Sequence, residues 1–564
     1  MKSFRYFKKY LFLILIAFLF LSIHHSVFAE ELPNNKVGIH LAQPSDEDID
    51  RADELINSSG GVWGYVTIVI HEDDLSRDKW QPIFDKLRER RLIPIIRLAT
   101  RANGESWERP HSKDAEEWVS FLNSLNWVVR NRYIILFNEP NHGTEWGGEV
   151  DTQSFGEVNE AFARKLKAAS TDFFIMMGGM DVSAPQQKPR YMDASVFLRE
   201  TIEEIGVEDF NTYFDGLSSH SYPNPGFVGS VRGVGRGSIR TYVWELSLLK
   251  NMGIKDLPVF ITETGWNGDV LSREAIAENF LYAYQSVWLP DERVVAVTPF
   301  ILNYQGEPFF KFSWVKRDNV GVYPEFGKIQ TLTKEEGRPE IFESGGVEFH
   351  LPHDIVEYST YHSQIQITNK GQGIWSNENG YSLILEGIPQ TQYLISSLGT
   401  VKPFESRTLD VYFSTEAAVG SSETRFILNR HDVPVLKSQV WRYDVVPLPS
   451  LQISVSLLPK LKTSDTGFEL QVFDEYEELI FRQKGISVEA GRGVLNIVEN
   501  IALGTRYRLV LLKQYYLPRQ AYLTFEKDGN EVVFKPMIPL DFDESGAFNW
   551  GDISAFFTTL PQRI

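Results

Sequence analysis

Residues 133–140 read YIILFNEP, an apolar run that stops at an amide, a carboxylate and a proline. A second run of this kind, PVFITETGW at residues 258–266, also carries a carboxylate where its apolar part ends. Short, continuously apolar segments are typical of strands buried on both faces of a parallel sheet. A charged group at the end of such a strand costs desolvation energy unless it has a partner or a task. Both runs therefore predict buried strands that present Glu139 and Glu263 at a functional edge of the sheet.

Eight apolar runs alternate with amphipathic segments between residues 36 and 335. The runs are residues 37–41, 65–70, 93–98, 133–138, 173–180, 214–220, 258–263 and 294–302. Helical periodicity lies between them, for example at residues 78–90, 114–129, 155–169, 194–205, 238–252 and 272–289. The number of predicted strands and the length of the segment that contains them match a (β/α)₈ TIM barrel. An open doubly wound sheet alternates in the same way, but no glycine-rich phosphate loop follows the first run, so we expect the barrel over residues 30–340.

The sequence changes character beyond residue 340. Alternating apolar and polar residues at 363–368, 381–385, 408–413 and 440–445 predict an immunoglobulin-like β-sandwich over residues 341–447. A proline-containing linker follows, and strands at 507–512, 520–526 and 532–534 predict a second small all-β module over residues 448–535. The sequence thus predicts an α/β barrel followed by two all-β domains and a short C-terminal segment, residues 536–564.

The first 29 residues have the pattern of a secretory signal peptide. Four basic residues precede an apolar stretch at 11–23, and small residues ending at Ala29 form a cleavage site. The apolar stretch is shorter than the ~20 residues that span a bilayer. An uncleaved membrane anchor is the alternative to a cleaved signal over residues 1–29, and in either case we expect an extracellular or cell-surface protein.

Composition excludes several classes of function. The chain has 75 acidic and 56 basic residues, a net charge of −19, which argues against binding to nucleic acid or anionic lipid. It has no cysteine, so thiol catalysis and thiolate metal sites are excluded. An exported chain without disulfides must be stabilised by its hydrophobic cores, and 43% of the residues are hydrophobic.

Two carboxylates that face each other across a cavity are the catalytic groups of most glycoside hydrolases. In the retaining route one attacks the anomeric carbon and the other protonates the leaving oxygen, with the carboxyl groups ~5–5.5 Å apart. The C-terminal ends of TIM-barrel strands form the open mouth where functional groups gather. Glu139 and Glu263, at the ends of the fourth and seventh runs, are the candidate pair.

The two motifs together resemble the clan A glycoside hydrolases, including the family 5 cellulase-like enzymes. Asn138-Glu139-Pro140 and Thr262-Glu263-Thr264-Gly265-Trp266 carry this resemblance, which covers residues 36–335. It implies that Glu139 is the acid/base, Glu263 the nucleophile and Asn138 the group that binds the sugar 2-hydroxyl. His220-Ser221-Tyr222, after the sixth run, is similar to the clan as well. The resemblance then implies that Tyr222 orients the nucleophile and that His220 is a donor in the pocket wall.

The sequence departs from the clan pattern at two places. The clan usually has an arginine near the end of strand two, where this chain reads Ile70-His71-Glu72-Asp73, and Arg97 after the third run is the nearest substitute. The clan also usually has a tryptophan at the end of strand eight, where this chain reads Leu302-Asn303-Tyr304.

Aromatic residues near the predicted strand ends are candidate sugar platforms, since pyranose rings present apolar C–H faces. These candidates are Trp146, Trp266 and Trp314, with core packing as the alternative; for Trp63, Trp80 and Trp118 we expect core packing. The glycine-rich loop at residues 223–237 is a candidate lid or wall of the cleft, or an inert surface loop.

Residues 541–552 read DFDESGAFNWGD, which places oxygen-bearing groups at the ligand positions of an EF-hand loop, with glycine at position six. The candidate calcium ligands are Asp541, Asp543, Ser545, Ala547 through its carbonyl, Asn549 and Asp552. The loop resembles one half of a dockerin module, with a helix expected at residues 553–560. Dockerins usually carry two such loops, so we expect a structural calcium ion and no cohesin-type partner.

We therefore predict a secreted, monomeric retaining glycoside hydrolase that cleaves β-linked polysaccharide or oligosaccharide without a catalytic cofactor. The β-modules are expected to bind substrate, to attach the enzyme to a cell surface or cell wall, or to act as spacers. A non-catalytic carbohydrate-binding or adhesion protein on the same scaffold is the first alternative. A metal-dependent barrel hydrolase is the second, and it would need paired histidines on the first strand, where His40 stands alone.

Overall fold

The computed structural model describes residues 34–388, 392–415, 419–459 and 464–559. It divides into two compact units, Met1–Phe342 and Glu343–Ile564. The segments predicted at residues 341–447, 448–535 and 536–564 fall in the second unit, apart from the two residues before Glu343. The predicted signal peptide lies outside the described residues. Among the residues that are described, no helix combines the length and the apolar character that a membrane crossing requires.

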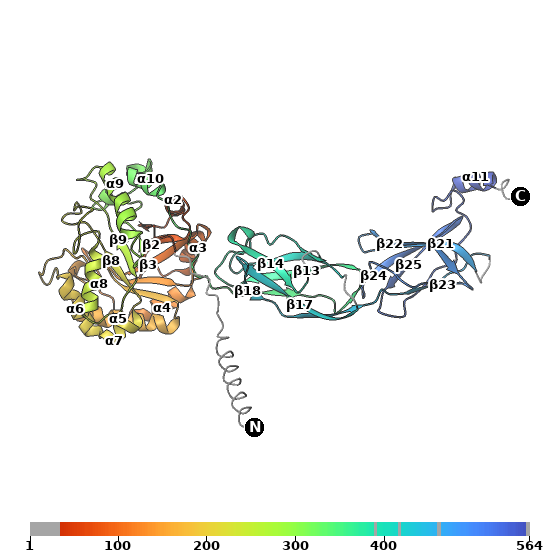
Figure 1. Cartoon of the computed structure of the whole chain (residues 1–564), viewed down its shortest axis with the longest axis horizontal. Helices are drawn as coiled ribbons and strands as arrows, with labels where there is room; N and C mark the ends of the chain where they lie inside the picture. Colours follow the sequence, from red (N-terminus) through yellow and green to blue (C-terminus); the bar gives the residue numbers. More distant parts are fainter. Residues whose placement is uncertain (1–33, 389–391, 416–418, 460–463, 560–564) are drawn as a thin grey trace, which may run out of the picture. The chain divides into compact units, whose positions relative to one another are not determined.

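The first unit is built on a closed sheet of eight parallel strands (Figure 1). In spatial order these are β1 Gly38–Leu41, β2 Gly64–His71, β3 Leu92–Ala99, β6 Arg132–Leu136, β7 Phe173–Met177, β8 Gly216–His220, β9 Val259–Glu263 and β10 Val294–Val297. A parallel bridge between Val37 and Val297 closes the ring, and the His40 amide donates to the Pro299 carbonyl at 3.0 Å. Closure confirms the predicted barrel and excludes the open sheet.

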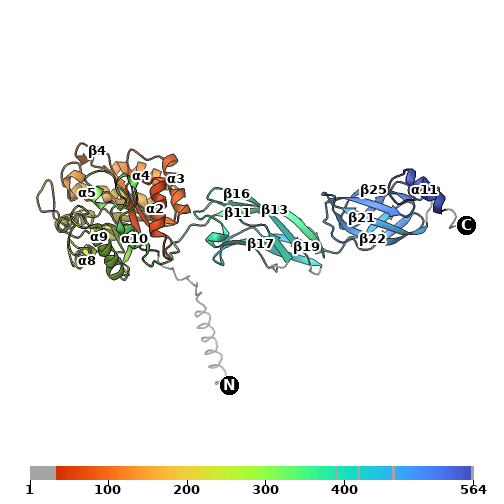
Figure 2. The same ribbon diagram turned by 90° about the horizontal axis from the view of Figure 1, so that it is seen from above.

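Helices cover the outer side of this barrel (Figures 1 and 2). They are α2 Asp46–Ile56, α3 Arg77–Glu89, α4 Ala115–Ser124, α5 Thr152–Ala169, α6 Ala194–Ile205, α7 Val207–Tyr213, α8 Thr241–Asn251, α9 Arg273–Ala283 and α10 Pro324–Gln330. Several begin at a side-chain cap: Ser45, Asp151 and Asp193 each accept a backbone N–H of the first turn of α2, α5 and α6. The predicted helix at 272–289 continues from α9 as a π-helical turn, Tyr284–Trp288.

Aromatic side chains fill the barrel interior at the end where the strands begin. Tyr65 of β2, Tyr133 of β6, Phe174 of β7 and Phe260 of β9 form one cluster. Their ring centroids are 5.1 to 6.2 Å apart. Because this end is closed by side chains, an interior cavity can open only at the other end, where the strands finish.

Three strands end earlier than the sequence pattern predicts, and one of them, β7, stops at Met177 instead of residue 180. Strand β6 stops at Leu136 instead of residue 138, because Phe137 (φ 68°) and Glu139 (φ 30°) have left-handed backbone conformations that no strand can contain. Strand β10 stops at Val297 instead of residue 302. In all three cases residues of the following segment line the barrel mouth rather than extend the sheet.

The second unit begins with two sheets that enclose a common core. One contains β11 Gly345–Phe349, β13 Thr360–Asn369, β16 Ser406–Ser414 and β15 Tyr393–Ile395. The other contains β12 Asp354–Val356, β19 Trp441–Val446, β17 Gly420–Arg430, β14 Tyr381–Glu386 and β18 Val433–Lys437. Buried side chains from both sheets, among them Ile365, Val411, Phe426 and Trp441, meet between them.

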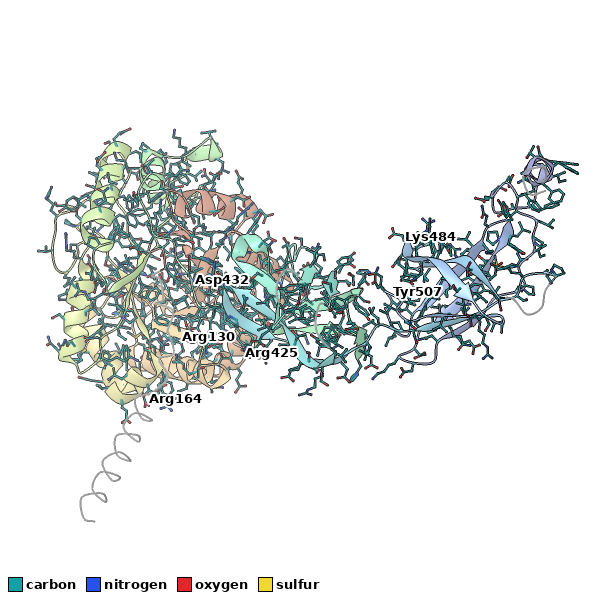
Figure 3. The ribbon with its side chains drawn as sticks, turned by 45° about the vertical axis from the view of Figure 1, so that its right-hand side comes forward. Arg130, Arg164, Arg425, Asp432, Lys484 and Tyr507 are labelled. Carbon is teal, nitrogen blue, oxygen red and sulfur yellow. The ribbon has the colours of Figure 1, made fainter. Side chains whose placement is uncertain are left out.

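Two further sheets with a core of their own follow. They are β23 Arg492–Leu495, β20 Leu451–Ser454 and β26 Glu531–Val533, and β22 Leu479–Val488, β21 Asp465–Phe473, β24 Arg506–Lys513 and β25 Tyr516–Thr524. Tyr507 of β24, labelled in Figure 3, belongs to this core, and its hydroxyl accepts the Ala502 amide at 2.8 Å. Barrel followed by small all-β sheets is the predicted fold class. The last element is α11, Trp550–Thr559, which starts three residues before the predicted helix at residue 553.

Candidate active site

A cavity of about 490 Å³ opens where the barrel strands end. Residues at the ends of β1, β2, β3, β6, β9 and β10 and in the segments after them line it, so it lies in the barrel mouth. Four carboxylates face it, those of Glu139, Glu145, Asp181 and Glu263. Arg97 and Lys311 also line it, together with the imidazoles of His40, His71 and His142.

The carboxylates of Glu139 and Glu263 meet in this cavity. One oxygen of each lies within 4.8 Å of the other and of a ring nitrogen of His220. Retaining glycosidases hold their carboxyl groups ~5–5.5 Å apart, whereas inverting enzymes hold them ~6.5–9.5 Å apart to admit a water molecule. The spacing of this pair matches the retaining arrangement.

Glu263, the last residue of β9, is buried among hydrogen-bond donors. Arg97 of β3 donates from Nη1 to Oε1 at 2.7 Å, and the Tyr222 hydroxyl donates to Oε2 at 3.1 Å. Burial by itself raises the pKa of the Glu263 carboxyl, but the nearby charges of His220 and Arg97 and the Tyr222 hydroxyl outweigh burial and leave that pKa below its usual value. Glu263 is therefore held as an anion, the state that a nucleophile requires.

Glu139 is held by His220 and by an unusual backbone. Its Oε1 lies 2.8 Å from Nδ1 of His220, and its amide donates to the Gly179 carbonyl at 3.1 Å. Its φ of 30° is sterically unfavourable for a residue with a side chain, a kind of strain that clusters at functional sites. Gly179 lets the imidazole approach, since a Cβ there would lie 2.3 Å from His220 Cδ2.

Asn138, the residue before Glu139, is linked to Glu263 through Arg97. The guanidinium Nη1 that contacts Glu263 also donates to Asn138 Oδ1 at 2.6 Å. Arg97 is thus placed at the site, although it stands on the third strand rather than the second. All six polar groups that the sequence singles out for the barrel mouth, Glu139, Glu263, Asn138, His220, Tyr222 and Arg97, are brought together.

The sequence interpretation missed several polar residues of the cavity, among them His142, Glu145 and Asp181. Asn138 Nδ2 donates to Glu145 Oε2 at 3.3 Å, and His142 Nε2 lies 2.8 Å from Asp181 Oδ2. Burial and the charge of Glu139 raise the pKa of Glu145 to about 7. Burial lowers the pKa of His142, but Asp181 and Glu139 outweigh it, so this pKa lies above its usual value. These residues lie four to nine positions beyond the ends of β6 and β7, in segments whose path the sequence pattern does not indicate.

The three predicted tryptophan platforms are wrong. Trp146, Trp266 and Trp314 are 0 to 1% exposed and belong to the barrel core. Trp146 packs edge-on against Phe155, and Trp266 and Trp314 both pack against Phe280, with ring centroids 4.8 to 4.9 Å apart. Phe155 belongs to α5 and Phe280 to α9, so these tryptophans pack against the surrounding helices and cannot stack on a ligand. As expected from the sequence, Trp80 and Trp118 are buried in that core, and Trp63 packs against it.

Other aromatic residues line the cavity instead. Trp107 lies on a short hairpin, β4 Ala102–Asn103 and β5 Ser106–Trp107, that no sequence pattern indicated. After β10 the wall is formed by Phe300, Tyr304, Phe309 and Phe312. Phe227 of the glycine-rich loop lines the cavity too, so this loop is a wall of the cleft. Trp266 supports the loop from below through a bond from Nε1 to the Gly229 carbonyl at 3.2 Å.

The charged residues of the site do not favour the alternative of a metal-dependent barrel hydrolase. Glu139, His220 and Glu263 lie close enough to share an ion, but the cation beside Glu263 is already supplied by the Arg97 guanidinium. His40 is fully buried, and burial together with Arg97 lowers its pKa to about 3. It has no second histidine beside it on β1.

The predicted calcium loop brings its ligands together. Oxygens of Asp541, Asp543 and Asp552 lie within 4.8 Å of one another, and Gly546 has the positive φ of 82° that the turn needs. Asn549 Nδ2 lies 2.8 Å from Ser545 Oγ, 3.1 Å from the Ala547 carbonyl and 3.3 Å from Asp543 Oδ2. This amide nitrogen therefore stands where three candidate ligand oxygens converge. The residues present fit a hard cation with oxygen ligands.

No family model and no curated protein matches the sequence. Similar solved structures include a family 39 glycoside hydrolase from Bacteroides cellulosilyticus WH2, at 12% identity and a TM-score of 0.39 over 68% of this chain and 82% of that one. A triple variant of an endo-β-1,4-glucanase from Xanthomonas axonopodis pv. citri has 10% identity and a TM-score of 0.36 over 52% and 98% of the chains. A β-mannanase from Thermomonospora fusca has 14% identity and a TM-score of 0.36 over 53% and 90%. Likenesses at this level carry no argument about activity, which rests on the site geometry above.

Proposed function

We propose that this protein is an exported retaining glycoside hydrolase that cleaves β-glycosidic bonds of a polysaccharide or oligosaccharide. The observation that carries the proposal is the pair of carboxylates in the barrel mouth, with one oxygen of Glu139 and one of Glu263 within 4.8 Å of each other. A merely structural pair of glutamates would not need a depressed pKa on one partner and an open cavity beside both.

The reaction follows from the surroundings of each group. The Glu263 carboxylate attacks the anomeric carbon while Glu139 gives its proton to the leaving glycosidic oxygen, which breaks the C–O bond and forms a glycosyl ester. Glu139, now ionised, takes a proton from water, and the resulting hydroxide displaces Glu263. Arg97 and Tyr222 hold the Glu263 carboxylate in place through their hydrogen bonds at 2.7 and 3.1 Å.

A panel of aryl β-glycosides and polysaccharides tests the proposal on the full chain. Glu263→Gln should lower kcat by at least ~10⁴-fold, because it removes the nucleophile. Glu139→Gln should lower kcat by about 10²–10⁴-fold on natural glycans and much less on aryl glycosides whose leaving group needs no proton. Glu116→Gln is the control, since Glu116 is an exposed residue paired with Lys165 on the outside of the barrel.

The stereochemistry of the first product separates the retaining route from its rival. Proton NMR should show the β-anomer before mutarotation. An α-anomer as first product would contradict the double displacement, and binding of glycan without turnover by the unaltered chain would favour the non-catalytic alternative.

We further propose that residues 541–552 bind one calcium ion as a structural clip. Trp550 is 84% exposed and adjoins the candidate ligands, so it should sensitise Tb³⁺ luminescence when that ion replaces calcium. Asp543→Ala should abolish the signal, whereas Trp550→Phe should abolish luminescence but keep calcium-dependent protection from proteolysis. Chelation should leave hydrolysis unchanged. Equal luminescence from the Asp543→Ala variant would contradict this site.

A further inference from the structure

The cavity holds a third carboxylate that the two-carboxylate mechanism does not use. Glu145 ends the short 3₁₀ helix Gly143–Glu145 after β6 and lines the cavity. Its one hydrogen-bond partner among the described side chains is Asn138, and no described basic side chain forms an ion pair with it. A half-buried carboxylate without a cationic partner is costly, and burial accordingly raises its pKa to about 7. We therefore expect a bound ligand to supply a hydrogen-bond partner for the Glu145 carboxylate.

The orientation of the Asn138 amide is fixed by Arg97. A guanidinium can only donate hydrogen bonds, so the Asn138 atom that lies 2.6 Å from Arg97 must be the carbonyl oxygen. The amide nitrogen is then the atom that lies 3.3 Å from Glu145. One of its two hydrogens is directed to Glu145, and the second is free for a ligand. The wall at this point therefore presents a donor and an acceptor side by side.

This donor and acceptor pair lies next to the anomeric centre. A single atom, Arg97 Nη1, bonds to the nucleophile Glu263 at 2.7 Å and to Asn138 at 2.6 Å. In a pyranose the anomeric carbon is bonded within the ring to the ring oxygen, which carries no hydroxyl, and to C2. The hydroxyl nearest the reacting bond is therefore the one on C2.

We propose that Glu145 is a specificity-determining residue that accepts a hydrogen bond from the substrate 2-hydroxyl while Asn138 donates one to it. The substrate class is then glycans with a free hydroxyl at C2. A hydroxyl donates and accepts at once, so it satisfies both groups. A 2-deoxy sugar leaves Asn138 and Glu145 each one hydrogen bond short, which is a situation in which a site discriminates strongly. This inference rests on the proposed function for the identity of the reacting carbon.

A pair of iminosugars that differ only by the hydroxyl at C2 tests the proposal on the full chain by calorimetry. The unaltered protein should bind the hydroxylated compound at least ~10-fold more tightly than its 2-deoxy counterpart. Glu145→Ala should reduce this ratio of Kd values about 10-fold, mainly by weakening the hydroxylated compound. Glu145→Gln keeps an acceptor oxygen and should retain part of the preference. Glu149→Ala is the matched control, because Glu149 is an exposed acid four residues away that pairs with Arg109.

Two results would overturn the assignment. They are an unaltered ratio of Kd values in Glu145→Ala, including the case in which both affinities fall equally, and tighter binding of a 2-amino analogue than of the 2-hydroxy compound. The last would make Glu145 a charge partner for an ammonium group. Because the readout is binding, it does not depend on turnover. Failure of the proposed function would instead show as an absence of hydrolysis across the aryl glycoside panel.

Discussion

His220 Nδ1 lies 2.8 Å from Glu139 Oε1, and the imidazole can come this close only because residue 179 has no side chain. The same nitrogen lies 3.9 Å from Glu263 Oε2, so one ring nitrogen is close to both carboxylates. Burial lowers the pKa of His220, but the carboxylates of Glu263 and Glu139 outweigh burial and raise it. The end of β8 thus places an imidazole with a raised pKa beside both carboxylates.

Gly179→Ala should displace this ring. The added Cβ would lie 2.3 Å from His220 Cδ2, so the imidazole must move and lose its contact with Glu139. We expect kcat/KM to fall by about 10²-fold, since the group that holds the acid/base is misplaced. Gly327→Ala, at a helical glycine with open space around it, is the control and should leave activity unchanged. Equal activity of both variants would contradict the role of His220.

The pH profile should respond to Arg97. Glu263 attacks as an anion, so activity is lost as pH falls through its pKa, and a lowered pKa puts this acid limb below the usual 4.5. Arg97→Met removes a nearby positive charge, which should raise the pKa of Glu263 and move the acid limb of kcat/KM to higher pH. Arg97→Lys keeps the charge and should move the limb less. A limb that stays in place or moves to lower pH in Arg97→Met would show that Arg97 does not control this ionisation.

Two tryptophans should separate binding from stability. Trp107 lines the cavity, so Trp107→Ala should raise KM for glycans with little change in the free energy of unfolding. Trp146 is fully buried against Phe137 and Phe155, so Trp146→Ala should cost about 3–5 kcal/mol of stability through the void it leaves. Denaturant unfolding and steady-state kinetics on both variants check this. The reverse pattern would restore Trp146 as a sugar platform.

The Tyr222 hydroxyl should matter for rate. Tyr222→Phe removes a donor 3.1 Å from Glu263 Oε2 and leaves a buried carboxylate with one hydrogen bond fewer. Hydrogen bonds to charged groups are worth about 1.5–3 kcal/mol, which corresponds to a kcat lowered about 10- to 160-fold. Tyr213→Phe, which removes a surface hydroxyl bonded to Arg164, should have no effect. A Tyr222→Phe variant with full kcat would argue against an orienting hydroxyl.

The barrel could be predicted from the sequence because its strands are buried on both faces. Such strands read as unbroken apolar runs, and the helix predicted at residues 194–205 coincides with α6. The C-terminal end of β6 could not be predicted in the same way. Phe137 is as apolar as the strand before it, and its φ of 68° is imposed by the turn that presents Glu139.

The polar site was predictable where a residue ends a strand or follows it within a few positions. Glu263 ends β9, Asn138 and Glu139 follow β6, and the structure brings them together. Glu145 and Trp107 reach the cavity from connecting segments, whose path depends on tertiary contacts that leave no periodic signal. The tryptophan predictions failed for a related reason: residue type indicates affinity for sugar or for a core, and only burial decides between them.

Glu139 follows β6 and Glu263 ends β9, so β7 and β8 lie between them in the ring. The distance between the carboxylate oxygens of Glu139 and Glu263 is therefore set by the hydrogen-bonded strands of the barrel. Trp107, Phe227 and Phe309, in contrast, line the cavity from segments outside that sheet. Replacing such segments would alter which polymer is digested while the configuration of the released sugar stays the same. Evolution of these connecting segments would therefore change substrate preference and leave the stereochemical course of the reaction unchanged.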